Sequence, residues 1–192
     1  MTTLFVARHG QTEWNREHRW QGWSDPPLNR TGREQAAQLA ELLAGRGIDV
    51  VVSSDLRRAA ETAEIAAARL GLSVALDARL REVDVGEWSG LTSAEVEARF
   101  PDGYRRRREG RTGWEKGEEL GAMAERVVAA LLDLADRHSG HRVLVVTHGG
   151  PLRATLAACG RDMRTVPAAG NGEVVEIAVR DGRMRRIKST RG

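Results

Sequence analysis

Two stretches far apart in the chain each end an apolar run on a histidine and a glycine. Residues 4–6 lead into Arg-His-Gly at 8–10, and residues 143–146 lead into Thr-His-Gly-Gly at 147–150. A guanidinium is a fixed cation with several donors for phosphate oxygens, and a neutral imidazole can attack phosphorus or relay a proton. Glycine would let an anion approach the backbone. One such stretch is compatible with a strand that ends in a surface histidine, but two favour chemistry on phosphate.

The apolar runs before these histidines are typical of strands buried on both faces of a sheet. Similar runs at 50–52 and 74–76 predict further strands, and Asp181-Gly182 predicts a hairpin between strands at 174–179 and 184–188. Helical spacing predicts one helix from a Thr31–Glu34 capping box to Gly45 and others over about 56–70, 92–100, 118–138 and 149–159. The sequence therefore predicts an α/β protein whose ligand site lies at the carboxyl ends of its strands.

The motifs and their order resemble those of the histidine phosphatase superfamily, the phosphoglycerate mutase-like proteins. The first signature of that family, Arg-His-Gly after strand one, matches residues 8–10. The resemblance covers nearly the whole chain and continues through Asn15, Gln21-Gly22, residues 53–59, Thr62-Ala63, Leu80-Arg81-Glu82, residues 86–90 and residues 147–150. It implies a three-layer α/β/α sandwich with a mostly parallel central sheet, formed by a single domain over residues 1–192.

The resemblance also implies a role for each catalytic residue. His9 would attack phosphorus in line and form a phosphohistidine, which water then hydrolyses. Arg8, Arg58 and His148 would surround the phosphate and stabilise its charge. Glu82 would protonate the leaving alkoxide and then accept a proton from the attacking water. We expect the arginines to lower the pKa of His9 by like-charge repulsion, which keeps the nucleophile unprotonated near neutral pH.

Other residues of the pattern are expected to bind the substrate without taking part in the reaction. These candidates are Asn15, Gln21, Gly22 and Gly149. Asp84 and Glu87 are the alternatives for the acid if the register of the resemblance differs by a turn. Residues 86–90 resemble the Gly-x-Trp-x-Gly that follows the acid in the family, which favours Glu82.

A basic segment lies between the acid and the second histidine. Residues 105–108 are four consecutive arginines, within a lid-like segment of about 92–117. Such a run is commonly solvated or poorly ordered, and the alternative is a basic lid that selects substrates with a second negative charge. Gly117-Glu118-Glu119 stands where many family phosphatases have Gly-Glu-Ser, so the sequence does not fix the subfamily.

The resemblance implies a metal-independent phosphoric monoester hydrolase that acts on a small phosphorylated metabolite without a cofactor. The alternative is a 2,3-bisphosphoglycerate-dependent phosphoglycerate mutase, in which the phosphohistidine meets a second substrate hydroxyl. The short segment from Glu82 to His148 favours the phosphatase, whereas the arginine run supports the mutase. A non-catalytic scaffold that binds anions or nucleic acid is a third alternative, but it leaves the histidines and Glu82 without a role.

Composition agrees with one globular domain. The chain has 192 residues, 41% hydrophobic and 30% charged, with a net charge of +3, which favours anionic partners. Cys159 is the only cysteine, so we expect a reducing compartment and a cytoplasmic protein. We expect no membrane span and no nucleic-acid partner. We also expect no metal, since His138 and His141 lack further ligands at zinc-site spacing. The oligomeric state stays open, with a homodimer as one alternative.

Overall fold

A single mixed sheet forms the centre of the protein, in a computed structural model that describes residues 1–161 and 169–187. Its strand order is β3-β2-β4-β1-β5-β6. The strands are β1 (Thr2–Arg8), β2 (Val50–Ser53), β3 (Val74–Leu76), β4 (Arg142–Thr147), β5 (Val174–Arg180) and β6 (Arg183–Arg186). The first four pair in parallel, while β5 and β6 form an antiparallel hairpin beside β1. The predicted α/β class and mostly parallel sheet are confirmed, and Lys188 of the predicted hairpin lies outside the described residues.

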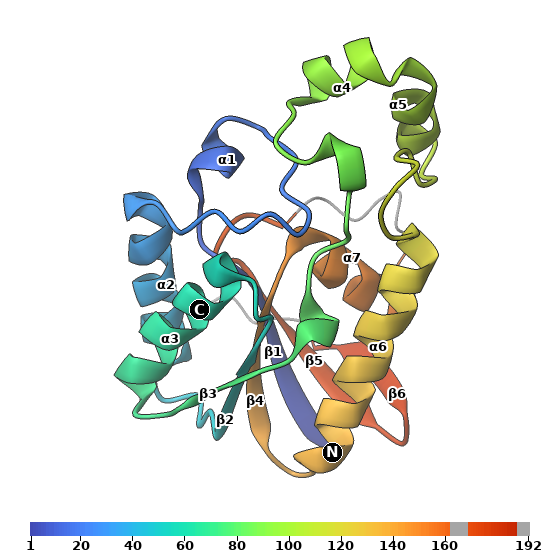
Figure 1. The fold of residues 1–192 in the computed structure, drawn as a ribbon. Coiled ribbons are helices and arrows are strands. Elements are labelled where there is room, and N and C mark those ends of the chain that lie inside the picture. The colour runs from blue at the N-terminus through green and yellow to red at the C-terminus, as the bar shows by residue number, and fades with distance from the viewer. Residues whose placement is uncertain (162–168, 188–192) are drawn as a thin grey trace.

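Helices cover both faces of this sheet (Figure 1). Helices α2 (Arg30–Leu43) and α3 (Arg57–Leu70) lie on one face, and α6 (Leu120–Arg137) and α7 (Gly149–Ala158) lie on the other. Strand β1 shows why its sequence is apolar throughout: Phe5 packs in the core with α2 and α3, whereas Leu4 and Val6 pack in the opposite core with α6 and α7. A strand that is buried on both faces cannot alternate polar and apolar residues.

The first long helix begins two residues earlier than predicted. Asn29 is the cap of α2, and its side-chain oxygen accepts the N–H of Gly32 at 2.9 Å. The capping box predicted at Thr31 is therefore wrong. The amide nitrogen of Asn29 also donates to Gln11 at 2.9 Å, so this cap joins α2 to the loop after β1, an advantage that a cap at Thr31 would lack. That loop also holds a short helix, α1 (Glu13–Arg16), which the sequence analysis did not predict.

Residues 81–85 form the loop that holds Glu82, which we call the acid loop. The segment between the acid loop and α6 folds into two helices beyond the carboxyl edge of the sheet (Figure 1). Two 3-10 turns, Ala78–Leu80 and Gly86–Trp88, precede α4 (Ser93–Arg99) and α5 (Pro101–Arg108). The helix predicted over about 92–100 is confirmed as α4, which Thr92 begins in a capping box with Glu95. As predicted, the helix that follows Thr92 ends before Pro101, and Pro101 is the first residue of α5, a position that needs no N–H donor. The four arginines are therefore helical.

Three tryptophan rings anchor this segment, which we call the lid (residues 92–117). Trp88 is fully buried, with its ring 5.4 Å from Trp20 and 5.5 Å from Trp114. Trp20 belongs to the loop after β1, so the lid packs directly on the segment that follows the first histidine. Among the described residues, no helix is both long enough and apolar enough to cross a membrane.

Candidate active site

The two histidines meet because their strands are parallel neighbours. β1 and β4 pair with Arg8 opposite Thr147, so the residue after each strand reaches the same edge of the sheet. The backbone N–H of His9 donates to Thr147 at 2.9 Å, and the rings of His9 and His148 lie 5.1 Å apart. The parallel register alone therefore brings together residues 139 positions apart in the sequence.

His9 is oriented with one nitrogen toward the protein and the other toward an arginine. Its Nδ1 donates to the carbonyl oxygen of Gly10 at 2.7 Å, and Nε2 lies 3.3 Å from Nε of Arg58. Burial, followed by the charges of Arg58 and Arg8, holds the pKa of His9 well below its usual value. The predicted direction is correct, but burial contributes more than the arginines. The ring is neutral at pH 7 and keeps a lone pair on Nε2.

Arg58 is held rigidly beneath the cavity. Its side chain is fully buried at the start of α3, and its terminal nitrogens donate to the carbonyls of Ser24 at 2.7 Å and Gly22 at 2.8 Å. Burial lowers the pKa of Arg58 to about 10, so the guanidinium remains charged at neutral pH. Arg8 donates to the carbonyl of Ala169 at 2.6 Å, and its Nε is buried without a partner in the described part of the chain. An anion in the cavity would supply that partner.

Glu82 follows the first 3-10 turn, and its carboxylate lies against the start of α7. The N–H of Gly150 donates to Oε2 at 3.1 Å, and the N–H of Val83 donates to Oε1 at 2.9 Å. Neither alternative acid lines the cavity: Asp84 accepts the N–H of Gly86, and Glu87 accepts two backbone N–H groups of the lid. Among the three carboxylates, only Glu82 reaches the site.

His148 forms the cap of α7 and is fully buried. Its Nε2 lies 2.9 Å from the hydroxyl of Ser54. Its Nδ1 is buried and has no hydrogen-bond partner among the described residues. Burial, then the charge of Arg58, holds the pKa of His148 well below its usual value, so this ring is also neutral.

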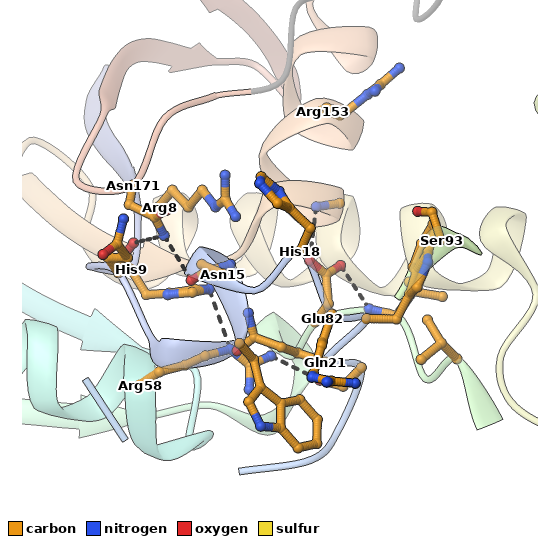
Figure 2. Close-up of a pocket in the computed structure, with 18 of the residues that line it drawn as sticks. Arg8, His9, Asn15, His18, Gln21, Arg58, Glu82, Ser93, Arg153 and Asn171 are labelled. Carbon is orange, nitrogen blue, oxygen red and sulfur yellow. Dashed lines mark hydrogen bonds between the residues drawn. The ribbon is translucent and has the colours of Figure 1, made fainter. Parts of the chain in front are cut away.

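A cavity of about 620 Å³ opens between these groups and the lid. Arg8, His9, Arg58 and Glu82 line it, together with the substrate-binding candidates Asn15, Gln21 and Gly22. Figure 2 shows six of these residues, whose side chains converge from β1, the loop after it, α3 and the loop of Glu82: Arg8, His9, Asn15, Gln21, Arg58 and Glu82. Gly149 and the buried His148 are not part of the lining, whereas the next residue, Gly150, is.

The motifs, the fold and this site agree with comparisons to known proteins. The model of the histidine phosphatase superfamily (branch 1) matches residues 4–189. The chain belongs to the histidine phosphatase superfamily. It is 39% identical to phosphoglycerate mutase-like protein 4 of Arabidopsis thaliana, over 93% of this chain and 80% of that protein. It is 38% identical to phosphoserine phosphatase 1 of Hydrogenobacter thermophilus, over 82% of this chain and 76% of that protein.

A solved structure supports the same relationship. The mycobacterial glucosyl-3-phosphoglycerate phosphatase in complex with VO3 superposes with a TM-score of 0.87 at 33% identity, covering 96% of each chain. The predicted family is thus confirmed from both sequence and structure.

In this histidine phosphatase, two of the predicted binding side chains are already engaged by the protein. The side-chain oxygen of Asn15 accepts the N–H of Thr12 at 3.0 Å, and that of Gln21 accepts the Thr12 hydroxyl at 3.1 Å. With these oxygens engaged, the amide nitrogens are the groups left to donate to a ligand. Gly10 serves a purpose different from the predicted one: a side chain there would overlap with the backbone of Gly32. The residue is glycine because the loop crosses the start of α2, and the space is not open to an anion.

The structure adds residues to the site of this histidine phosphatase that the sequence analysis missed. Asn171 donates to the carbonyl of His9 at 3.0 Å and to Asn15 at 3.2 Å. Arg126 of α6 donates to the carbonyls of Arg81 and Glu82, each at 2.9 Å, and so fixes the acid loop. Neither residue stands in a local pattern, since their contacts span large separations along the chain. In the described ranges, no three His, Cys, Asp or Glu side chains are grouped to hold a metal ion.

Proposed function

We propose that this histidine phosphatase hydrolyses phosphate monoesters of small metabolites through a phosphohistidine on Nε2 of His9. The carrying observation is a neutral, buried His9 whose Nε2 faces a cavity between Arg58 and Glu82. A nitrogen that is unprotonated at neutral pH and held beside two guanidinium groups combines a nucleophile with a site for a dianion. Two of the relatives named above are phosphatases, which supports hydrolysis.

The reaction has two displacements at phosphorus. In the first, Nε2 of His9 forms a bond to phosphorus, the ester P–O bond breaks, and the protonated carboxyl of Glu82 gives its proton to the leaving oxygen. In the second, water attacks phosphorus, its proton passes to the Glu82 carboxylate, and the P–N bond breaks to release phosphate. Glu82 thus acts first as acid and then as base.

The remaining groups stabilise the charge on the phosphoryl oxygens. Arg8 and Arg58 line the cavity and supply two fixed cations. His148 would donate an N–H from its Nδ1, which is buried without a hydrogen-bond partner among the described residues. Because phosphoryl transfer needs mainly positioning and electrostatic stabilisation, these preorganised donors account for catalysis in this proposal. Asn15, Gln21, Gly22 and the backbone of Gly149 would orient the substrate. No metal ion or cofactor takes part in this scheme.

A phosphoglycerate mutase is the second candidate. One relative is named a phosphoglycerate mutase-like protein, and an arginine of the lid, Arg107, lines the cavity. The same phosphohistidine would then transfer its phosphoryl group to a substrate hydroxyl instead of water.

We expect the enzyme to act in the cytoplasm, and this expectation rests on the lone Cys159. Its expected partner is the phosphomonoester substrate.

Turnover of p-nitrophenyl phosphate, with a rapid quench into alkaline denaturant, tests the proposal. Phosphorylated enzyme that survives alkali but not acid is expected, with the phosphate mapped to His9. His9→Ala should abolish both turnover and labelling, whereas His141→Ala, an exposed histidine outside the cavity, should leave them unchanged. Activity lost on adding a chelator, or undiminished in His9→Ala, would refute the scheme. Isomerisation of 3-phosphoglycerate with 2,3-bisphosphoglycerate, without phosphate release, would favour the mutase.

A further inference from the structure

Trp23 is the exposed member of the five tryptophans of the chain. The residue is 43% exposed, whereas Trp88 and Trp114 are buried and Trp14 and Trp20 are half-buried. Trp23 is also absent from the residues that line the active-site cavity. Neither core packing nor contact with the substrate therefore explains a large aromatic side chain at this position.

Two contacts fix the indole of Trp23 to the acid loop. Its Nε1 donates to the backbone carbonyl of Glu82 at 2.7 Å. The guanidinium of Arg81 lies 4.9 Å from the centroid of the ring, a distance at which a cation is attracted to the face of an indole. The carbonyl of Glu82 also accepts Arg126 at 2.9 Å. Side chains from the loop after β1 and from α6 thus share the acceptor capacity of this oxygen.

The neighbours of Trp23 in the sequence hold the buried Arg58. The carbonyl oxygens of Gly22 and Ser24 accept its terminal nitrogens at 2.8 and 2.7 Å. A side chain at Gly22 would overlap with Val85, so this segment lies in direct contact with the acid loop. Three consecutive residues therefore connect Arg58 to the acid loop.

Arg81 makes a second connection between the acid loop and the start of α3. Its guanidinium forms a two-pronged pair with Asp55, at 2.7 Å from Nε and 2.5 Å from a terminal nitrogen. Asp55 lies between β2 and α3, three residues before Arg58. A bidentate pair of this kind fixes the orientation of the guanidinium. The ring of Trp23 therefore lies against a cation that is itself held in place.

The proposed reaction requires a fixed distance between Arg58 and Glu82. Arg58 would bind the phosphoryl group, and the proton of Glu82 would pass to the leaving oxygen, which is bonded to the same phosphorus. A general acid works within hydrogen-bond reach of its acceptor, and a displacement of about 1 Å can cost about 100-fold in rate. Because the two residues belong to different elements, this distance depends on contacts that join those elements.

We propose that Trp23 is a positioning residue, whose indole aligns the acid Glu82 with the phosphate that Arg58 binds. This inference rests on the proposed phosphatase function and adds to it a residue outside the cavity. The indole N–H holds the backbone of Glu82, and the carbonyls on either side of Trp23 hold Arg58. Loss of the indole should therefore impair protonation of the leaving group and leave the attack by His9 intact.

Two substrates with one aromatic ring each separate protonation from attack. Benzyl phosphate releases an alkoxide that needs a proton, whereas p-nitrophenyl phosphate releases a stabilised phenolate that needs none. Trp23→Phe keeps a ring beside Arg81 and removes the N–H. It should lower kcat/KM for benzyl phosphate by about 3- to 10-fold, the range of one hydrogen bond. Trp23→Ala also removes the ring and should lower it by about 10- to 100-fold.

The second substrate and a matched variant are the controls. For p-nitrophenyl phosphate, both Trp23 variants should keep kcat/KM within about twofold of the wild type, because attack at phosphorus is unchanged. Leu76→Ala also truncates an exposed apolar side chain outside the cavity, and it should behave as wild type with both substrates. Glycerol 3-phosphate, another alkyl ester, should respond as benzyl phosphate does.

A double-mutant cycle shows whether the effect of Trp23 passes through the acid. The amide of Glu82→Gln cannot give up a proton, so adding Trp23→Phe to that variant should cause no further loss on benzyl phosphate. Equal losses on both substrates, no loss on benzyl phosphate, or a loss that persists beside Glu82→Gln would overturn the role of Trp23 and leave the proposed function standing. No hydrolysis of any alkyl phosphate by the wild type, or wild-type activity of Glu82→Gln on benzyl phosphate, would overturn the proposed function and this inference with it.

Discussion

The hydroxyl oxygen of Ser54 lies 2.9 Å from Nε2 of His148, and both side chains are fully buried. The same oxygen accepts the N–H of Leu56 at 3.3 Å, so the hydroxyl proton is free to point at the imidazole. The lowered pKa of His148 leaves its ring neutral, with a single N–H. A hydroxyl that donates to Nε2 places that N–H on Nδ1, the nitrogen without a protein partner in the described residues. We therefore expect Ser54 to hold His148 in the tautomer that can donate to a phosphate.

Replacing Ser54 by alanine should lower kcat/KM by about 10- to 100-fold, because Nε2 loses its buried partner and the ring can adopt the wrong tautomer. Nitrogen NMR of the imidazole should show the change directly. Ser53→Ala is the matched control, since the buried Ser53 hydroxyl donates to a backbone carbonyl and not to the histidine. An unchanged His148 tautomer in Ser54→Ala would refute this role.

Gly150→Ala should disable the acid. A Cβ at this position would overlap with Oε1 of Glu82, whereas a Cβ at Gly149 would meet its nearest atom, Nε of Arg8, at 3.7 Å. Displacing Glu82 should cost about 100-fold or more in kcat for an alkyl phosphate, the range of general acid–base catalysis. The loss should be much smaller for p-nitrophenyl phosphate, whose leaving group needs no proton. Gly149→Ala should lose far less with either substrate, and equal losses in the two variants would contradict this account.

Arg126→Lys should loosen the acid loop. The guanidinium donates to three backbone carbonyls of residues 79–82 and forms a two-pronged pair with Glu118, a fork that an ammonium cannot reproduce. We expect a loss of about 1–3 kcal/mol in the free energy of unfolding and a lower kcat. Chemical denaturation and steady-state kinetics measure the two effects. Arg137→Lys is the control, because its pair with Asp133 is exposed and such pairs contribute little. Wild-type kcat in Arg126→Lys would show that the loop does not need the fork.

The central sheet and the meeting of the two histidines follow from local sequence. Doubly buried strands need unbroken apolar runs, and parallel strands end at one edge, so the runs before His9 and His148 already predict their proximity. Arg58 and Glu82 are different. Nothing in the local sequence distinguishes Arg58 from a solvated arginine at the start of a helix, or Glu82 from the neighbouring Asp84 and Glu87. Only the family motif singled out Arg58 and Glu82.

The residues that the sequence analysis missed act through contacts that leave no local pattern. Asn171 reaches His9 across 162 positions, and Arg126 holds the acid loop from the middle of α6. The helix through the arginine run was also missed, because four consecutive like charges favour a solvated segment, whereas this part of the lid packs around Trp88. Likewise, Asn29 caps α2 because it also bonds the loop after β1, which a search for capping boxes cannot detect.

The two buried imidazoles should make stability fall as the pH is lowered below neutrality. Both histidines have folded-state pKa values well below the unfolded value of about 6.5. Below pH 6.5, therefore, the two rings bind protons in the unfolded chain but not in the folded chain. The free energy of unfolding should be flat above pH 7 and should decrease by up to about 1.4 kcal/mol per pH unit for each ring between pH 6.5 and 5. Carboxylates with lowered pKa values, such as Asp55 and Asp77, act in the same direction but only at lower pH, because the ordinary pKa of an aspartate side chain is 3.8. Denaturant titrations in phosphate-free buffer measure the slope, and His148→Asn should remove about half of it. A flat profile between pH 7 and 5 would mean that the buried rings take up protons in the folded state, and His9 would then lose its nucleophilic lone pair at the same pH.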